Sequence, residues 1–190
     1  MANLTQLTPG LWTGGDLPAG QAGLDHLRDW REIGVTHVID NRIEWSDEDL
    51  VARSMPAVEY LHNGVDDAGQ LMPDEWFDRG VGFALAAWAD DPAAVVVAHC
   101  HMGINRGPSM AYAILLSVAW DPIEAIDHLR RTRPIAAVDY AEDALDWHLR
   151  RAGAGESDRL AAREELAAWR WREPHDTYRI IRSIRDEEVA

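Results

Sequence analysis

The chain is organised around the stretch Ala93-Ala-Val-Val-Val-Ala-His-Cys-His-Met-Gly-Ile-Asn-Arg-Gly-Pro-Ser109. It opens on a short apolar run, residues 93–98, which follows the break at Asp91–Pro92. Such a run predicts a strand that is buried on both faces, as in a parallel sheet. After a few loop residues a helical pattern begins at Pro108. A strand, a tight loop and a helix N-terminus together form an anion site, because backbone N–H groups converge where the helix dipole is positive.

The loop in this stretch carries a thiol and a guanidinium. Cys100 begins the loop and Arg106 closes it, and Gly103 lies between them, where the backbone must come close to a ligand. A ring of N–H donors favours the thiolate form of a cysteine, which is a nucleophile. The planar fork of Arg106 matches two oxygens of a phosphoryl group. The combination predicts that the loop binds a phosphate ester and that Cys100 attacks its phosphorus.

The pattern His-Cys-x-x-Gly-x-x-Arg, here His99, Cys100, Gly103 and Arg106, resembles the signature of the cysteine-dependent protein tyrosine phosphatases. Three further stretches resemble the dual-specificity branch of that superfamily: Leu-Trp-x-Gly at 11–14, Gly-Val-Thr-His-Val-Ile at 34–39, and Glu-Ala-Ile…Arg-Pro at 124–134. The resemblance covers roughly residues 5–151. It implies a single α/β domain with a central, mostly parallel sheet flanked by helices.

The motif allows two other interpretations. One is a buried structural cysteine beside an unrelated arginine. The other is a zinc site made by His99, Cys100 and His101. Adjacent residues at a strand end point in different directions, and no second Cys/His pair lies at ligand spacing, so the sequence disfavours zinc. We therefore expect no metal and no cofactor.

The resemblance also implies roles for the loop residues. The loop binds the phosphate, which makes His101, Met102, Gly103, Ile104, Asn105 and Gly107 the expected substrate-binding residues. The residue before the cysteine lies behind the loop, which gives His99 a supporting role: it orients the loop and tunes the thiol by hydrogen bonding. The side chains of His101 and Asn105 are expected to shape the mouth of the pocket.

The general acid of the family lies in the loop before the helix that leads to the signature strand. Asp67 lies 33 residues ahead of Cys100, at about the family's spacing. Its neighbour Asp66 is the alternative, and we favour Asp67. For either residue the structural alternative is a solvated loop carboxylate.

One position departs from the family's pattern. The family usually carries Ser or Thr directly after the loop arginine, where the hydroxyl stabilises the departing thiolate. Here that position is Gly107, and Ser109 is two residues further on. The departure predicts slow breakdown of the phosphocysteine intermediate.

Composition bounds the class of protein. A length of 190 residues, 47% of them hydrophobic, favours one domain with a sizeable core. The formal net charge of −15 argues against binding to nucleic acid or to an anionic membrane. Cys100 is the single cysteine, so no intramolecular disulfide can form. No stretch is apolar enough to span a bilayer or to form a signal peptide, so we expect a cytoplasmic protein.

The remaining elements follow from local signals. We expect strands at 10–14, 35–40 and 58–61 and a capped short helix from Ser46. Longer helices are expected from Asp16 to Ile33, from Met72 to Trp88, and over 108–120, 121–133 and 138–149. Gly153-Ala-Gly155 then breaks the pattern. We therefore expect a catalytic domain over 1–152 and a helical extension over 153–190, packed on it or tethered to it, with a last short helix around Tyr178, Ile181 and Ile184.

The function expected from these observations is hydrolysis of phosphate monoesters on phosphotyrosine, phosphothreonine or phosphoserine of a protein, through a phosphocysteine. Two alternatives stay open. One is a phosphatase for a small metabolite, a nucleotide or an RNA 5′ end, because the variant His-Cys-x-x-Gly-x-Asn-Arg also resembles RNA 5′-triphosphatases. The other is a pseudophosphatase that binds phosphate without turnover. The sequence leaves the oligomeric state open.

Overall fold

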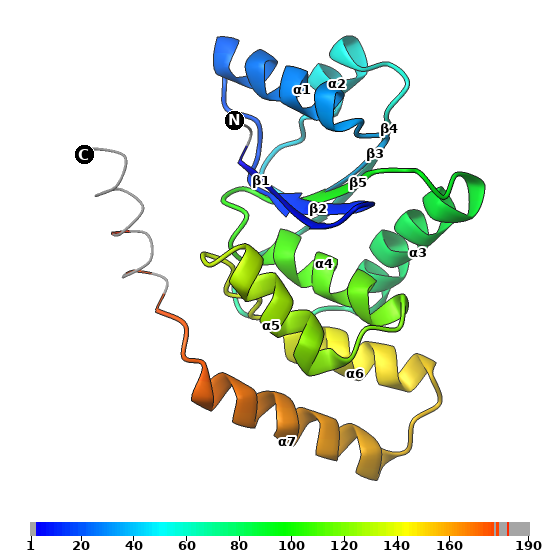
Figure 1. Ribbon diagram of the computed structural model, residues 1–190, viewed down its shortest axis with the longest axis vertical. Helices are drawn as coiled ribbons and strands as arrows, with labels where there is room; N and C mark the ends of the chain where they lie inside the picture. Colours follow the sequence, from blue (N-terminus) through cyan, green and yellow to red (C-terminus); the bar gives the residue numbers. More distant parts are fainter. Residues whose placement is uncertain (1–2, 177, 179–181, 183–190) are drawn as a thin grey trace.

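The strands of the computed structural model, which describes residues 3–176, 178 and 182, form one five-stranded sheet in the order β1-β2-β5-β3-β4 (Figure 1). Strand β1 pairs antiparallel with β2, and the other three pairs are parallel. The strands are β1 (Leu4–Thr8), β2 (Leu11–Gly14), β3 (His37–Arg42), β4 (Glu59–Val65) and β5 (Val96–His99). Strand β5 lies at the centre, and all of its residues are buried, as predicted for the apolar run before Cys100.

Helices cover both faces of the sheet (Figure 1). Two lie on one face, α1 (Gln21–Ile33) and α2 (Glu48–Ser54). The other face carries α3 (Asp74–Asp90), α4 (Arg106–Ser117), α5 (Pro122–Thr132) and α6 (Ala141–Arg151). This arrangement confirms the expected α/β class with a mostly parallel sheet.

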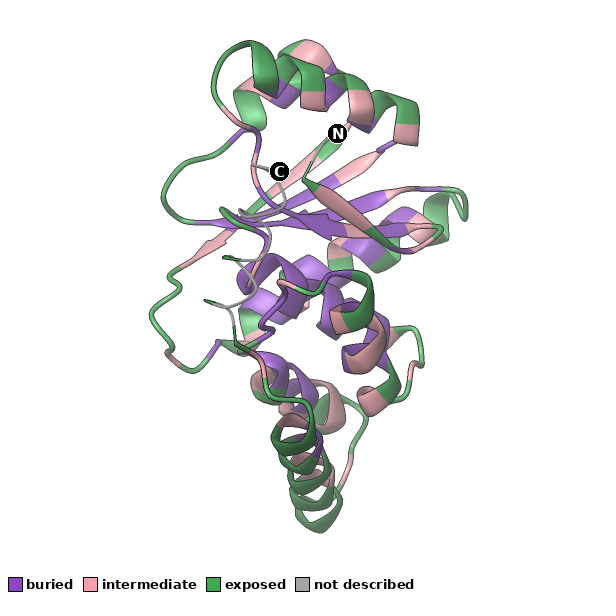
Figure 2. Cartoon of the chain, turned by 60° about the vertical axis from the view of Figure 1, so that its left-hand side comes forward, coloured by how far each residue is buried: buried purple, intermediate pink, exposed green. Residues whose placement is uncertain are grey.

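The apolar run before Cys100 packs on both faces of the sheet. Val97 joins the apolar cluster under α1 and α2, whereas Val96 and Ala98 join the larger cluster under α3–α6. Residues Arg106–Leu116 of α4 are all buried, so this helix is the core element of the second face (Figure 2). A strand and a helix that are both fully packed hold the loop between them in a fixed position.

One local prediction was wrong, and one strand was missed. The first long helix begins at Gln21, not at Asp16. The backbone N–H of Asp16 donates to the carbonyl of His101 at 3.0 Å, and that of Leu17 to the carboxylate of Asp47 at 3.4 Å. These tertiary hydrogen bonds hold residues 16–17 in a non-helical path. Strand β1 was not predicted.

The C-terminal extension forms α7 (Glu156–Arg172), which packs across α5 and α6 (Figure 1). Leu166 and Trp169 are the buried residues of this helix, and most of its surface is exposed (Figure 2). Of the last short helix expected around Tyr178, the positions Ile181 and Ile184 lie outside the described residues. No helix in the described part of the chain has the length and apolar character needed to cross a membrane.

Candidate active site

The site lies in the loop between β5 and α4, at the carboxyl ends of the parallel strands. Cys100 begins the loop, is 2% exposed, and donates its N–H to the carbonyl of Gly14 at 3.2 Å. The N–H groups of residues 101–105 donate no hydrogen bond to any other described residue. Free amides in front of the N-terminus of α4 form an anion site, because the helix dipole adds positive potential at the same place.

Gly103 is required by the loop's path. Its φ of +66° lies in the left-handed region, which a residue with a side chain rarely adopts. A Cβ atom at this position would also collide with the backbone of Gly14 and with the guanidinium of Arg133. The glycine therefore lets the loop pack closely against β2.

Arg106 closes the loop and is 3% exposed. Its two terminal nitrogens are held from one side: Nη1 donates to Oε2 of Glu44 at 2.8 Å and to the carbonyl of Val65 at 2.9 Å, and Nη2 donates to Oε1 of Glu44 at 2.8 Å. Its Nε has no hydrogen-bond partner among the described residues and lies 3.3 Å from Oδ2 of Asp67. The edge of the guanidinium that carries Nε therefore faces the carboxylate of Asp67.

The charges around Arg106 act on one another. Burial would lower the pKa of Arg106, but its hydrogen bonds with Glu44 and the charge of Cys100 raise it above its ordinary value. The same hydrogen bonds lower the pKa of Glu44 to about 2, against a smaller opposing effect of burial. Both side chains are therefore charged across the neutral range. Glu44 was not predicted, because it is one of several acids in the polar stretch 41–49.

Asp67 lies beside Arg106 and is tied to the loop. Its Oδ1 accepts a hydrogen bond from Nδ2 of Asn105 at 2.7 Å and one from the hydroxyl of Tyr140 at 2.8 Å. Asp66 is exposed, and its backbone carbonyl accepts a hydrogen bond from Gln70. The structure therefore places Asp67, and not Asp66, in contact with the loop residues.

His99 lies behind the loop and is fully buried. Its ring packs edge-on against Trp30 with a centroid distance of 5.8 Å, and its Nε2 lies 3.9 Å from Oδ1 of Asp40. Neither ring nitrogen has a hydrogen-bond partner among the described residues. Burial lowers the pKa of His99, more than the charge of Asp40 raises it. The ring of His99 is thus enclosed beside Trp30 and Asp40, and it makes no hydrogen bond to the thiol of Cys100.

The other variable loop residues divide between the mouth and the interior. The side chain of His101 is 50% exposed; its Nδ1 lies 2.8 Å from Oδ2 of Asp16 and its ring packs on Trp45 at 4.9 Å. Met102 is also exposed. Asn105 is buried and its side chain turns toward Asp67.

A groove beside the loop begins at His101. It has a volume of about 790 Å³ and an apolar lining over much of its length. No Lys or Arg lines it, and the charged residues on its wall are two carboxylates, Asp16 and Asp47. The exposed apolar side chains of Leu24 and Trp45 also line this groove.

Gly107, the departure from the family's pattern, packs closely on the signature strand. A Cβ atom there would lie 3.0 Å from the carbonyl oxygen of Ala98 and 3.0 Å from backbone carbon atoms of His99. The hydroxyl of Ser109 donates to Oδ1 of Asn105 at 3.3 Å. The hydroxyl of Ser109 is therefore directed to Asn105, and the first turn of α4 has little room for a side chain at residue 107.

Arg133 supports the loop from outside the motif. Its Nε donates to the carbonyl of Gly103 at 2.6 Å, and its Nη2 to the carbonyl of Met102 at 3.3 Å. Nη1 and Nη2 also donate to side chains of the N-terminal segment, Thr5 at 3.1 Å and Asn3 at 2.9 Å. No local pattern indicates this role of Arg133, because its partners lie 30 or more residues away in the sequence.

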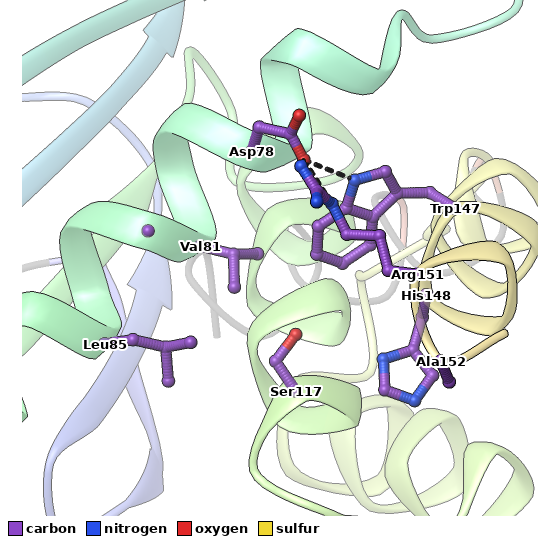
Figure 3. A pocket seen from close by; sticks show the side chains of 9 residues that line it. Asp78, Val81, Leu85, Ser117, Trp147, His148, Arg151 and Ala152 are labelled. Atoms are coloured by element: carbon purple, nitrogen blue, oxygen red, sulfur yellow. Dashed lines mark hydrogen bonds and ion pairs between the residues drawn. The ribbon is translucent and has the colours of Figure 1, made fainter.

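The described residues contain no group of three or more His, Cys, Asp or Glu side chains arranged to hold a metal ion. A separate cavity of about 440 Å³ lies between α3, the end of α4 and α6 (Figure 3). Its walls include Val81, Leu85, Trp147 and His148, and a pair formed by Asp78 and Arg151 lies at one side. None of the residues that line this cavity belongs to the loop between β5 and α4, so it is not part of the site.

Comparison with known proteins identifies the fold. No family model and no curated protein matches the sequence. Solved structures do match. PTPMT1 in complex with PI(5)P has a TM-score of 0.65 at 21% identity, over 80% of this chain and 97% of that one. DUSP15 has a TM-score of 0.62 at 17% identity, over 85% and 95%. The human tyrosine phosphatase-like serine/threonine/tyrosine-interacting protein has 0.59 at 16%, over 78% and 97%. The fold is therefore that of the dual-specificity phosphatases.

Proposed function

We propose that the protein is a cysteine-dependent phosphatase that hydrolyses phosphate monoesters, most readily those of phosphotyrosine, phosphothreonine or phosphoserine in proteins. One observation carries the proposal: a buried cysteine begins a loop whose backbone amides at 101–105 donate no hydrogen bond to other described residues, and a buried arginine closes the same loop. Such a site binds a tetrahedral oxyanion and holds its central atom in front of the sulfur.

The roles of the residues follow from this geometry. The thiolate of Cys100 attacks phosphorus, and the P–O bond to the leaving group breaks as the S–P bond forms. Arg106 and the loop amides hold the three equatorial oxygens. Asp67 donates a proton to the leaving oxygen; a positioned acid of this kind contributes on the order of 10²–10⁴-fold. The resulting carboxylate then accepts a proton from the water that hydrolyses the phosphocysteine.

The surroundings of the loop support a monoester over a polyphosphate. The groove at His101 offers apolar surface and carboxylates, with no Lys or Arg to bind a second phosphate. The net charge of −15 adds long-range repulsion of polyanions such as RNA. Phosphorylated side chains in a protein carry one phosphate on an organic group and fit these surroundings.

The proposal is tested by hydrolysis of p-nitrophenyl phosphate, phosphotyrosine and phosphothreonine peptides, and a nucleoside triphosphate. We expect the wild type to hydrolyse the first three, and Cys100→Ser to abolish turnover while keeping binding of inorganic phosphate. A chelator should leave activity unchanged. Absence of turnover with intact phosphate binding in the wild type would instead indicate a pseudophosphatase, and preference for the triphosphate would indicate a nucleotide or RNA 5′-end substrate.

The adjacent residues Asp66 and Asp67 offer a matched pair for the acid. Asp67→Asn should reduce kcat/KM on phosphopeptides by about a hundredfold or more, and Asp66→Asn by less than about twofold. The reverse order would assign the acid to Asp66 and would contradict the role given to Asp67.

A further inference from the structure

The carboxylate of Asp67 is held in one orientation by two donors. Nδ2 of Asn105 and the hydroxyl of Tyr140 both donate to its Oδ1, at 2.7 Å and 2.8 Å. Oδ2 is the atom that lies 3.3 Å from Nε of Arg106, the arginine that closes the loop between β5 and α4. Because Oδ1 is engaged by two donors, a proton on this carboxyl group must be carried by Oδ2.

The hydroxyl of Tyr140 also fixes the backbone of the loop that carries Asp67. It accepts a hydrogen bond from the N–H of Gly69 at 3.3 Å. The ring of Tyr140 is buried and packs edge-on against Trp76, at a centroid distance of 6.4 Å. Tyr140 thus holds both the carboxylate and the backbone of residues 67–69 from one buried position.

Asn105 connects this arrangement to the anion-binding loop. Its Oδ1 accepts a hydrogen bond from the N–H of Asp139 at 2.7 Å, while its Nδ2 donates to Asp67. The side chain of Asn105 therefore joins the anion-binding loop, the loop of Asp67 and the segment 138–140. A displacement of segment 138–140 would move both donors to Asp67 together.

The C-terminal helix α7 holds segment 138–140. Nη2 of Arg170 donates to the carbonyls of Val138 at 2.9 Å and Asp139 at 3.2 Å. Val138 is fully buried and has a φ of +56°, which is strained for a β-branched residue and persists only where its surroundings impose it. Beside it, Arg130 donates to the carbonyl of Ala137 at 2.9 Å and packs over the ring of Trp169 in α7 at 4.8 Å.

We propose that Tyr140 and Asn105 are positioning residues for the general acid, and that Arg170 of the C-terminal helix holds Tyr140 in place. The inference rests on the proposed phosphatase function. It assigns a role to α7, which lies far in sequence from the motif at 99–106. This helix supports the loop that carries Asp67, and it does so through segment 138–140. In the first step the proton on Oδ2 of Asp67 passes to the leaving oxygen, and Oδ1 keeps its two hydrogen bonds.

The activity test uses the leaving group as the readout. An acid matters little when the leaving group is stable as an anion, as p-nitrophenolate is, and matters greatly for phenolate or an alkoxide. Tyr140→Phe keeps the ring and removes the hydroxyl. We expect it to reduce kcat/KM for phenyl phosphate by about tenfold and for p-nitrophenyl phosphate by less than about twofold. An equal loss on both substrates, or no loss, would overturn the positioning role of Tyr140.

Arg170→Ala tests the contribution of α7, with Arg159→Ala as the matched control. Arg159 also lies on α7, but it pairs with Asp146 of α6 at 3.0 Å and does not contact segment 138–140. We expect Arg170→Ala, like Tyr140→Phe, to reduce kcat/KM for phenyl phosphate more than kcat/KM for p-nitrophenyl phosphate. Arg170→Lys should show a smaller difference between the two substrates. Arg159→Ala should behave like the wild type on both. Identical behaviour of the two alanine variants would overturn the role of α7.

A second readout does not depend on activity. Amide hydrogen exchange over residues 66–70 should become faster in Tyr140→Phe and Arg170→Ala, because the N–H of Gly69 loses its acceptor or that acceptor becomes mobile. It should stay unchanged in Arg159→Ala. Unchanged exchange in Tyr140→Phe would overturn the inference. If the variants show faster exchange but the wild type hydrolyses no phosphate ester, the result counts against the phosphatase function alone.

Discussion

Glu44 and Arg106 form a bidentate pair, with Nη1 and Nη2 each 2.8 Å from a carboxylate oxygen. With the two terminal nitrogens on Glu44, Nε of Arg106 lies 3.3 Å from Oδ2 of Asp67. Glu44 comes from the segment between β3 and α2, and Arg106 begins α4. An acid that is one of several in the sequence thus fixes the orientation of the arginine that closes the loop.

Removing Glu44 should weaken phosphate binding. In Glu44→Ala the guanidinium loses the partner that orients it, so we expect KM for p-nitrophenyl phosphate to rise and kcat/KM to fall by about tenfold. Steady-state kinetics at constant ionic strength measures this. Glu48→Ala removes an exposed acid of the same stretch and should change kcat/KM by less than about twofold. Equal effects of the two variants would mean that kcat/KM falls because of the change in net charge, and not because Arg106 loses its partner.

Gly107→Ser should increase neither the stability nor the turnover of the protein, although serine is usual at this position in the family. Its Cβ would meet the backbone of Ala98 and His99 at 3.0 Å, so we expect α4 to shift and the free energy of unfolding to fall by about 1–3 kcal/mol. Denaturant unfolding measures this. Gly82→Ser, in α3, meets no atom within 4 Å and is the control. A Gly107→Ser variant with wild-type stability and faster turnover would contradict the packing argument.

The wild type should accumulate the phosphocysteine. No described hydroxyl is directed at Cys100 to stabilise its departure, because position 107 is a glycine and the hydroxyl of Ser109 donates to Asn105. We expect a burst of p-nitrophenolate close to one equivalent per enzyme, and a covalent phosphoryl adduct on Cys100 by mass spectrometry after acid quench. A linear progress curve from the first turnover, with no adduct, would show that breakdown of the intermediate is not slow.

Arg133 should be needed for stability as well as for the loop. Arg133→Met removes the donors to the carbonyls of Gly103 and Met102, so both carbonyls lose this hydrogen-bond partner. We therefore expect a loss of about 2–4 kcal/mol in the free energy of unfolding. Arg131→Met is the control, because Arg131 is exposed and pairs with Asp127 at the surface; its loss should stay within about 0.5 kcal/mol. A loss below 1 kcal/mol for Arg133→Met would argue against the anchoring role.

Buried His99 predicts loss of stability in mild acid. Burial lowers its pKa below the ordinary value of 6.5. Below pH 6.5 the unfolded chain binds a proton that the folded protein still excludes, so the free energy of unfolding falls as the pH decreases, by at most about 1.4 kcal/mol per pH unit. Unfolding at pH 7 and pH 5 should show a smaller difference in His99→Phe than in the wild type or in the control His26→Gln. Equal differences in all three would contradict this.

The signature stretch could be predicted because its signals are local. An apolar run, a glycine with a defined role and a helix start lie within 93–109, and they place Cys100 and Arg106 on one loop whatever the rest of the chain does. Periodicity also located most helices, since the apolar face of each repeats within the helix itself. The start of α1 was misplaced because residues 16–17 make hydrogen bonds to segments far away in sequence.

The sequence by itself determined the α/β class and the loop that carries the thiol and the arginine. It also narrowed the general acid to two adjacent residues, Asp66 and Asp67. Only the tertiary structure decided which side chains hold them: Glu44 on Arg106, Arg133 under the loop, and Tyr140 on Asp67. These contacts join residues 30 to 73 positions apart. No local pattern records such pairs, because they exist only once the packing of β5 and α4 has brought the separate loops to one end of the sheet.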